Sequence, residues 1–301
     1  IYMQNSGLGN AINPLISIAH KKVYAVPLVL LIGWRGSPNA NDEPQHQAQG
    51  KVTREFLKLL GIKTLIMNNN NDLNKLKKLI SFSKKNSSPV AILIKNGQIE
   101  NNIFEKKIYK EKFNIKRIDF LETLLKKIDK NVKIISTTGY TSREIYQLRK
   151  QKKLNNGSDF YMVGGMGHSS NVALGYSNYT KRKVIVLDGD GSFLMHMGSM
   201  VNVGKLAGKN YKYILLNNCC HESVGSQKTL INSINLEMLS KSFGFKKYEE
   251  LRNNSEIANK IKNLLNSKEK FFLNVMIKRG SIKNLTRPKN FLKIKKKFIN
   301  S

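Results

Sequence analysis

The residues best suited to bind a metal ion and a phosphate group form two short motifs. Gly189-Asp190-Gly191 and Asn217-Asn218 are separated by residues 192–216, and each follows a short apolar run of the kind that forms a buried parallel strand. Parallel α/β sheets bind ligands at the carboxyl ends of their strands, so one carboxylate and one amide oxygen are expected in the same crevice. Mg²⁺ prefers such oxygens and often shares them with phosphates, while the glycines allow close backbone approach. The two motifs therefore predict a magnesium diphosphate site.

Alternating strand-like and helical segments predict how these motifs are positioned. The pattern indicates an α/β fold with two doubly wound parallel-sheet units, the first incomplete at its N-terminus because Ile1-Tyr2 resembles the end of a strand already under way. Strands are predicted at 26–32, 64–67, 89–94, 132–136, 160–163, 184–187, 213–216 and 271–277. Helices are predicted at 10–20, 51–60 and 72–85, with a polar linker over 95–116.

Two further helical signals and the chain's charge divide it into three segments. Ile118, Leu121, Leu125 and Ile128 mark one face of an amphipathic helix, and Thr141-x-x-Glu144 fits a capping box that opens another helix. The last residues are basic and poor in apolar side chains, which predicts a loose or peripheral tail. The expected divisions are a first domain with its linker over 1–112, a second domain over 113–280 and a tail over 281–301.

Composition narrows the class of partner. The 52 basic and 20 acidic residues give a formal net charge of +32, so nucleic acid must be considered as a partner. The lysines are scattered and accompanied by many asparagines, which favours a general compositional bias over a dedicated polyanion site. Adjacent Cys219 and Cys220 match no disulfide or zinc pattern, and no long apolar run occurs. We expect a cytoplasmic protein without a nucleic-acid or membrane partner.

The spacing of the two motifs resembles the signature of thiamine diphosphate (ThDP) enzymes. Other segments extend the resemblance over nearly the whole chain to the phosphonopyruvate and sulfopyruvate decarboxylases; they are 3–10, 31–36, 42–46, 136–139 with 141–144, 162–168 and 221–227. The family implies that Asp190, Asn218 and the backbone carbonyl of Cys220 bind Mg²⁺. The alternative from the residues alone is a pair of capped turns without metal.

The resemblance also implies contacts with ThDP itself. The Gly164 carbonyl would accept a hydrogen bond from the cofactor's 4′-amino group, and Met166 would be the wedge that bends the cofactor, although a lone methionine is more often core packing. The remaining cofactor-binding candidates are Gly189, Gly191, Ser192, Asn5, Ser6 and Gly7. In the family the cofactor lies between units of different subunits, which implies a homo-oligomer.

Histidines and arginines near these motifs are the candidates for catalysis and substrate binding. His168, His221 and His46 are preferred to His20 and His196 as general acids or bases, since imidazole titrates near neutral pH. Arg35 and Arg143 are the candidates for binding a phosphono or sulfo group.

These expectations combine into a non-oxidative decarboxylase that depends on ThDP and Mg²⁺. The resemblance implies conversion of a 3-substituted pyruvate, phosphonopyruvate first, to phosphonoacetaldehyde and CO₂ in phosphonate biosynthesis. Sulfopyruvate is the alternative substrate. The family's activating glutamate lies upstream of the position of Ile1, and neither Glu43 nor Glu55 lies in a matching motif. We therefore expect a truncated sequence, with a separate polypeptide that supplies this part or an inactive ThDP-binding partner subunit as alternatives.

Overall fold

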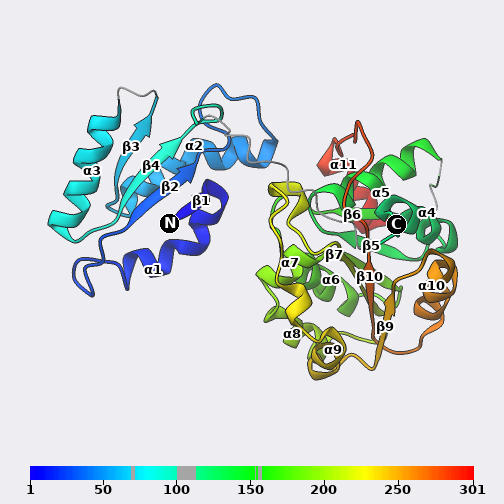
Figure 1. The fold of residues 1–301 in the computed structure, drawn as a ribbon. Helices are drawn as coiled ribbons and strands as arrows, with labels where there is room; N and C mark the ends of the chain where they lie inside the picture. The colour runs from blue at the N-terminus through cyan, green and yellow to red at the C-terminus, as the bar shows by residue number, and fades with distance from the viewer. Residues whose placement is uncertain (69–71, 100–112, 153, 155–157) are drawn as a thin grey trace. The chain divides into compact units, whose positions relative to one another are not determined.

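The chain folds as two compact units, residues 1–108 and 109–301, each with its own parallel sheet (Figure 1). The computed structural model describes residues 1–68, 72–99, 113–152, 154 and 158–301. All strand pairs within the two sheets are parallel, and helices alternate with strands along the chain. The predicted α/β class with two parallel-sheet units is confirmed. Most of the predicted 95–116 linker lies outside the described residues.

The first unit has a four-stranded sheet in the order β1-β2-β4-β3. Its strands are β1 (Tyr2–Gln4), β2 (Val29–Gly33), β3 (Lys63–Met67) and β4 (Val90–Ile94), and its helices are η1 (Asn5–Ala11), α1 (Ile12–Ile16), α2 (Pro44–Leu59) and α3 (Leu73–Asn86). All five residues of β4 are buried, because alternate side chains pack into clusters on opposite faces of the sheet. The three predicted strands of this unit are confirmed.

Two helices of the first unit differ from their predicted bounds. Helix α2 begins at Pro44, seven positions before the predicted start at residue 51, since proline suits the first helical turn, where its missing N–H is not needed. The predicted helix over 10–20 is a short α1 after the 3-10 helix η1.

The second unit has a six-stranded sheet in the order β6-β5-β7-β8-β10-β9. Its strands are β5 (Lys133–Ser136), β6 (Ser158–Tyr161), β7 (Val184–Gly189), β8 (Tyr211–Asn217), β9 (Lys247–Leu251) and β10 (Phe271–Met276). Its helices are α4 (Arg117–Lys127), α5 (Tyr140–Gln151), α6 (Ser169–Asn178), α7 (Asp190–Met195), α8 (Ser199–Leu206), α9 (Leu236–Phe243), α10 (Ile257–Asn266) and α11 (Phe291–Asn300), with short η3 (Glu222–Val224), η4 (Ile231–Ser233) and η5 (Asn254–Glu256). Strand β9, a polar strand at the edge of the sheet, was not predicted.

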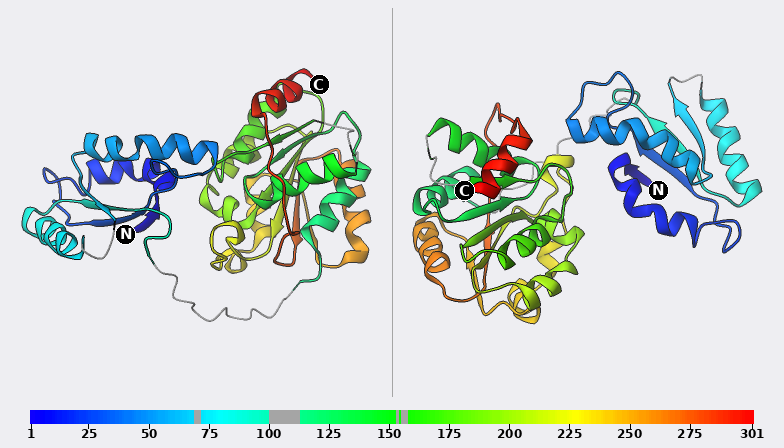
Figure 2. Two further views of the ribbon diagram at one scale, coloured as in Figure 1. Left: turned by 90° about the horizontal axis from the view of Figure 1, so that it is seen from above. Right: turned by 180° about the vertical axis from the view of Figure 1, so that it is seen from behind.

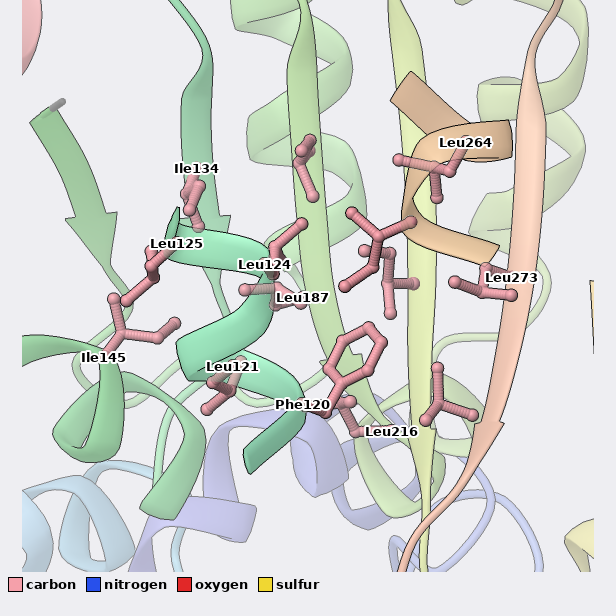
Figure 3. Packing of buried hydrophobic residues seen from close by; sticks show 14 of the residues in the cluster. Phe120, Leu121, Leu124, Leu125, Ile134, Ile145, Leu187, Leu216, Leu264 and Leu273 are labelled. Atoms are coloured by element: carbon pink, nitrogen blue, oxygen red, sulfur yellow. The ribbon is translucent and has the colours of Figure 1, made fainter. Parts of the chain in front are cut away.

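Both faces of the second sheet are covered by helices. Ile185 and Leu187 of β7 face a cluster that includes α4, α5 and α10, while Val184 and Val186 face the cluster with α6, α8 and α9. Figure 3 shows the first cluster, with the apolar side of α4 over the strands. The amphipathic helix predicted from Ile118 onwards is thereby confirmed. This double coverage keeps the sheet rigid and leaves the carboxyl ends of its strands for the site.

The C-terminal segment is more ordered than predicted. Helix α11 packs against β6 (Figure 2). Phe298 is buried, and its ring lies near those of Phe160 and Tyr176, at centroid distances of 5.5 and 4.7 Å. Of the two predicted alternatives, a loose tail is wrong for residues 291–300, whereas a peripheral segment agrees with a helix on the edge strand β6. The reason is that Ile294 and Phe298, four residues apart, lie on one helical face.

The predicted capping box at the start of α5 is also wrong. The N-cap residue is Gly139, with φ +96°, and it makes no side-chain capping bond. Glu144 instead forms an ion pair with Arg117 of α4. None of the helices among residues 1–68, 72–99, 113–152 and 158–301 is long and apolar enough to cross a membrane.

Candidate functional site

The candidate site lies where the strand order of the second sheet reverses. The chain leaves β5 for β6 on one side and later returns to β7 on the other side of β5. Open α/β sheets bind ligands outside the carboxyl ends of strands at such a point. A pocket there is lined by residues that follow β5, β7 and β8, including Thr137, Asp190 and Asn218. The two predicted motifs are therefore brought together.

Asp190 is a buried carboxylate. It is 2% exposed, and its Oδ2 accepts a hydrogen bond of 2.5 Å from the Thr229 hydroxyl. Burial raises the pKa of Asp190 to about 6, and the bond from Thr229 opposes that rise. None of the ion pairs among the described residues includes Asp190. A cation in this pocket would stabilise its charged form.

Asn218 lies opposite this carboxylate in the same pocket. Its Oδ1 accepts from the Cys220 N–H at 3.2 Å, and its Nδ2 donates to Oε2 of Glu222 at 3.0 Å. Asn217 turns elsewhere, because its Oδ1 accepts from the Cys219 N–H and its Nδ2 lies 3.5 Å from Oδ1 of Asn274. Cys220 lines the pocket with Asn218. The predicted metal-binding candidates thus share one pocket.

Ser192 connects three of the turns around the pocket. Its hydroxyl oxygen accepts from the Thr137 hydroxyl at 3.0 Å and from the Gly167 N–H at 2.9 Å. Both bonds are buried, so the ends of β5, β6 and β7 are held in register at the site. This position was predicted as a cofactor contact, and the described bonds give it a role in the shape of the pocket.

The turn over residues 164–167 depends on glycine. Gly164, Gly165 and Gly167 have φ of +69°, +56° and +91°, which side chains with a Cβ rarely adopt. This conformation places Met166 on the pocket wall. Gly164 begins the turn.

The five histidines separate into different surroundings. His221 lines the pocket and packs on Gly191, where an added Cβ would lie 2.3 Å from His221 Nδ1. The ring of His168 faces that of His196, with 4.3 Å between centroids and 32° between planes. The structure therefore pairs a preferred candidate with His196, which the sequence did not favour. The periodicity of α7 gave no signal for this pairing.

His46 belongs to the first unit and lies in the first turn of α2, not in a loop as the sequence suggested. Burial lowers the pKa of His46, and the nearby charge of Arg35 lowers it further.

Asn5, in η1, is buried and donates from Nδ2 to the Arg35 carbonyl at 2.9 Å and to the Thr53 hydroxyl at 3.0 Å. Ser6, next to Gly7, bonds to Gln4.

The arginines proposed for substrate binding are both engaged. Arg35 forms a bidentate pair with Asp42, with distances of 2.5 and 2.7 Å, and this bond holds the pKa of Asp42 below its ordinary value. Arg143 donates to the Leu285 carbonyl at 2.5 Å. Arg117, which the sequence analysis missed, lines the pocket instead. It is 5% exposed and pairs with Glu144 and Glu222, each at 3.0 Å.

The chemistry of these groups fits a magnesium diphosphate. Asp190, Glu222 and Arg117 are the charged residues on the pocket wall, so their formal charges sum to −1. A diphosphate needs a divalent cation to bind beside such a charge. No group of three or more histidine, cysteine, aspartate or glutamate side chains within the described ranges could hold a metal. One carboxylate, one amide oxygen and phosphate oxygens match the ligands that Mg²⁺ prefers.

Comparisons with known proteins agree with this chemistry. Residues 137–275 match the family described as "Thiamine pyrophosphate enzyme, C-terminal TPP binding domain". The chain is 31% identical over 307 residues to phosphonopyruvate decarboxylase of Streptomyces viridochromogenes, an alignment that spans 95% of this chain and 74% of that protein. It is 27% identical over 304 residues to sulfopyruvate decarboxylase of Methanosarcina acetivorans, spanning 93% and 76%. It is also 36% identical over 130 residues to sulfopyruvate decarboxylase subunit beta of Methanocaldococcus jannaschii, spanning 43% and 66%.

Proposed function

The chain belongs to the phosphonopyruvate and sulfopyruvate decarboxylase family of ThDP enzymes, and from this premise we propose that it decarboxylates phosphonopyruvate to phosphonoacetaldehyde and CO₂. One observation supports the proposal most directly. Asp190 and Asn218, the side chains that the family resemblance implies as metal ligands, line one pocket at the switch point of the sheet. The preference for phosphonopyruvate follows the more similar relative.

Asp190, Asn218 and the Cys220 carbonyl would hold Mg²⁺, with diphosphate oxygens completing its coordination. Gly189, Gly191 and Ser192 would contact the diphosphate group. When bound, ThDP would supply the carbanion and electron-sink chemistry that decarboxylation of a 2-oxoacid requires. Met166 would fix the bend of the cofactor from the pocket wall, and the Gly164 carbonyl would accept a hydrogen bond from it.

The protonation step is assigned to the histidines near the pocket. His221 packs beside the Asp190 turn, and His168 forms a ring pair with His196. Imidazoles exchange protons near neutral pH, so we propose that these groups deliver the proton to the product carbon. His46 of the first unit stays a candidate for the same role, together with Asn5, Ser6 and Gly7 as cofactor contacts. We further propose an oligomer, which is supported by a relative that is named as a subunit. That its subunits are identical is our prediction from the family resemblance.

The test is CO₂ release by the purified protein with ThDP and Mg²⁺, measured separately with phosphonopyruvate and sulfopyruvate. We expect turnover of phosphonopyruvate and loss of activity with a chelator. Turnover of sulfopyruvate alone would refute the substrate assignment. Binding of Mg²⁺ and ThDP without turnover of either oxoacid would indicate an inactive partner subunit or a chain that lacks the activating glutamate. A protein that binds neither ThDP nor Mg²⁺ would refute the proposal as a whole.

A further inference from the structure

Glu222 touches the proposed metal ligand Asn218 at the nitrogen end of its side-chain amide. Its Oε2 accepts from Nδ2 of Asn218 and from Nη1 of Arg117, both at 3.0 Å, and its Oε1 accepts from the Gly280 N–H. Its side chain is only 12% exposed. All three partners are donors, so the carboxylate is held in one orientation.

This arrangement determines which way the Asn218 amide points. An amide has a donating and an accepting end of nearly the same shape, and its hydrogen-bond partners decide which end lies where. An ionised carboxylate can only accept, so Glu222 must face the NH₂ group. The oxygen is then on the other side, where the Cys220 N–H donates to it at 3.2 Å. A flipped amide would present N–H to a cation.

Arg117 holds Glu222 in place. It is buried between Glu222 and Glu144, and it connects α4, α5 and η3 around the site. Its guanidinium donates a charge-assisted hydrogen bond to each of the two carboxylates.

We propose that Glu222 is a positioning residue that orients the Asn218 amide oxygen toward Mg²⁺. The inference rests on the proposed function of the pocket and adds to it a residue that acts through its hydrogen bond to Asn218. Partners that orient metal ligands in this way typically contribute about 10- to 100-fold to metal affinity.

The test is a double-mutant cycle in which the side chain at position 218 is replaced by one that presents an oxygen to the metal in either orientation. Aspartate at position 218 has an oxygen at both ends, so it cannot present a donor to the metal. Mg²⁺ is titrated calorimetrically into the purified protein at a fixed, saturating ThDP concentration. We expect Glu222→Ala to weaken Mg²⁺ binding by about 10- to 100-fold. Asn218→Asp alone is also expected to weaken it, because two carboxylates then face each other at the site of the present 3.0 Å bond.

The double variant Asn218→Asp/Glu222→Ala is expected to bind Mg²⁺ more tightly than either single variant, since the like charges and the wrong amide orientation are both removed. Additive losses would overturn the proposal and indicate a purely structural role for Glu222. Tighter binding by Asn218→Asp alone would overturn it as well. Glu237→Ala, a matched change at an exposed glutamate of α9, should leave Mg²⁺ affinity unchanged.

The swap Asn218→Asp/Glu222→Gln provides a second measurement if the alanine variant unfolds. It keeps one donor and one acceptor between the two positions, so Mg²⁺ affinity is expected to exceed that of Asn218→Asp alone. An equal or lower affinity would overturn the proposal. Wild-type protein that binds no Mg²⁺ and ThDP would instead refute the proposed function, which separates the two failures.

Discussion

Replacing Arg117 with methionine is expected to destabilise the second unit strongly. Arg117 is 5% exposed and forms ion pairs of 3.0 Å with Glu144 and Glu222, of which Glu144 is 1% exposed. At an effective dielectric constant of about 20, one such pair is worth roughly 5–6 kcal/mol before desolvation is subtracted. The variant leaves Glu144 buried without its cation. Loss of one partner of a buried pair typically costs about 3–5 kcal/mol, and we expect a decrease of that size in the unfolding free energy.

The assay is guanidinium denaturation followed by circular dichroism, without metal or cofactor. Burial raises the pKa of Glu144 even beside Arg117, and removal of the guanidinium would raise it further. A carboxyl group with a raised pKa in the folded state contributes stability that is lost as the pH rises through that pKa. The loss in Arg117→Met should therefore be smaller at low pH than at neutral pH.

The double variant Arg117→Met/Glu144→Met is the matched control. Apolar replacement of a whole buried pair is often nearly neutral, so the double variant should regain most of the lost stability. A loss below about 1 kcal/mol in the single variant would contradict the reasoning. So would a double variant that is as unstable as the single one.

Three further changes test the site and its support. Asp190→Asn should keep the fold and abolish the rise in melting temperature that Mg²⁺ with ThDP produces in the wild type; an undiminished rise would remove Asp190 from the metal site. Burial lowers the pKa of Lys212 from 10.5 to about 8, so between these two values the unfolded chain binds more protons than the folded protein. The stability of the wild type should therefore rise with pH over this range, and that of Lys212→Met should rise less steeply. Equal slopes would contradict this. Gly191→Ala should lower the unfolding free energy, measured by urea denaturation, by about 1–3 kcal/mol, because the added methyl group overpacks against His221. Adding His221→Ala to this variant should cancel most of that cost. A cost that persists without the imidazole would mean that another contact is responsible.

Hydrophobic periodicity predicted the fold well because the pattern of apolar residues in a short stretch of sequence indicates which side of a helix or strand is buried. The runs 184–187 and 213–216 are apolar because both faces of a central parallel strand are covered, and they lie in β7 and β8. The polar edge strand β9 was missed, since an exposed edge places fewer demands on its residues. The capping box failed because Glu144 has the right spacing for a local bond but is bound by Arg117, 27 positions away.

The amino-acid sequence by itself determined the α/β class, the two units, the pairing of Asp190 with Asn218 at strand ends, and the resemblance to a family. These follow from residue types and short spacings, which act through local backbone geometry. Only the tertiary structure decided that Glu222 connects Arg117 to Asn218, that His168 faces His196, and that Arg35 is engaged by Asp42. Side chains from distant segments meet only after the sheet has formed, and whether a charge is paired or available depends on that meeting.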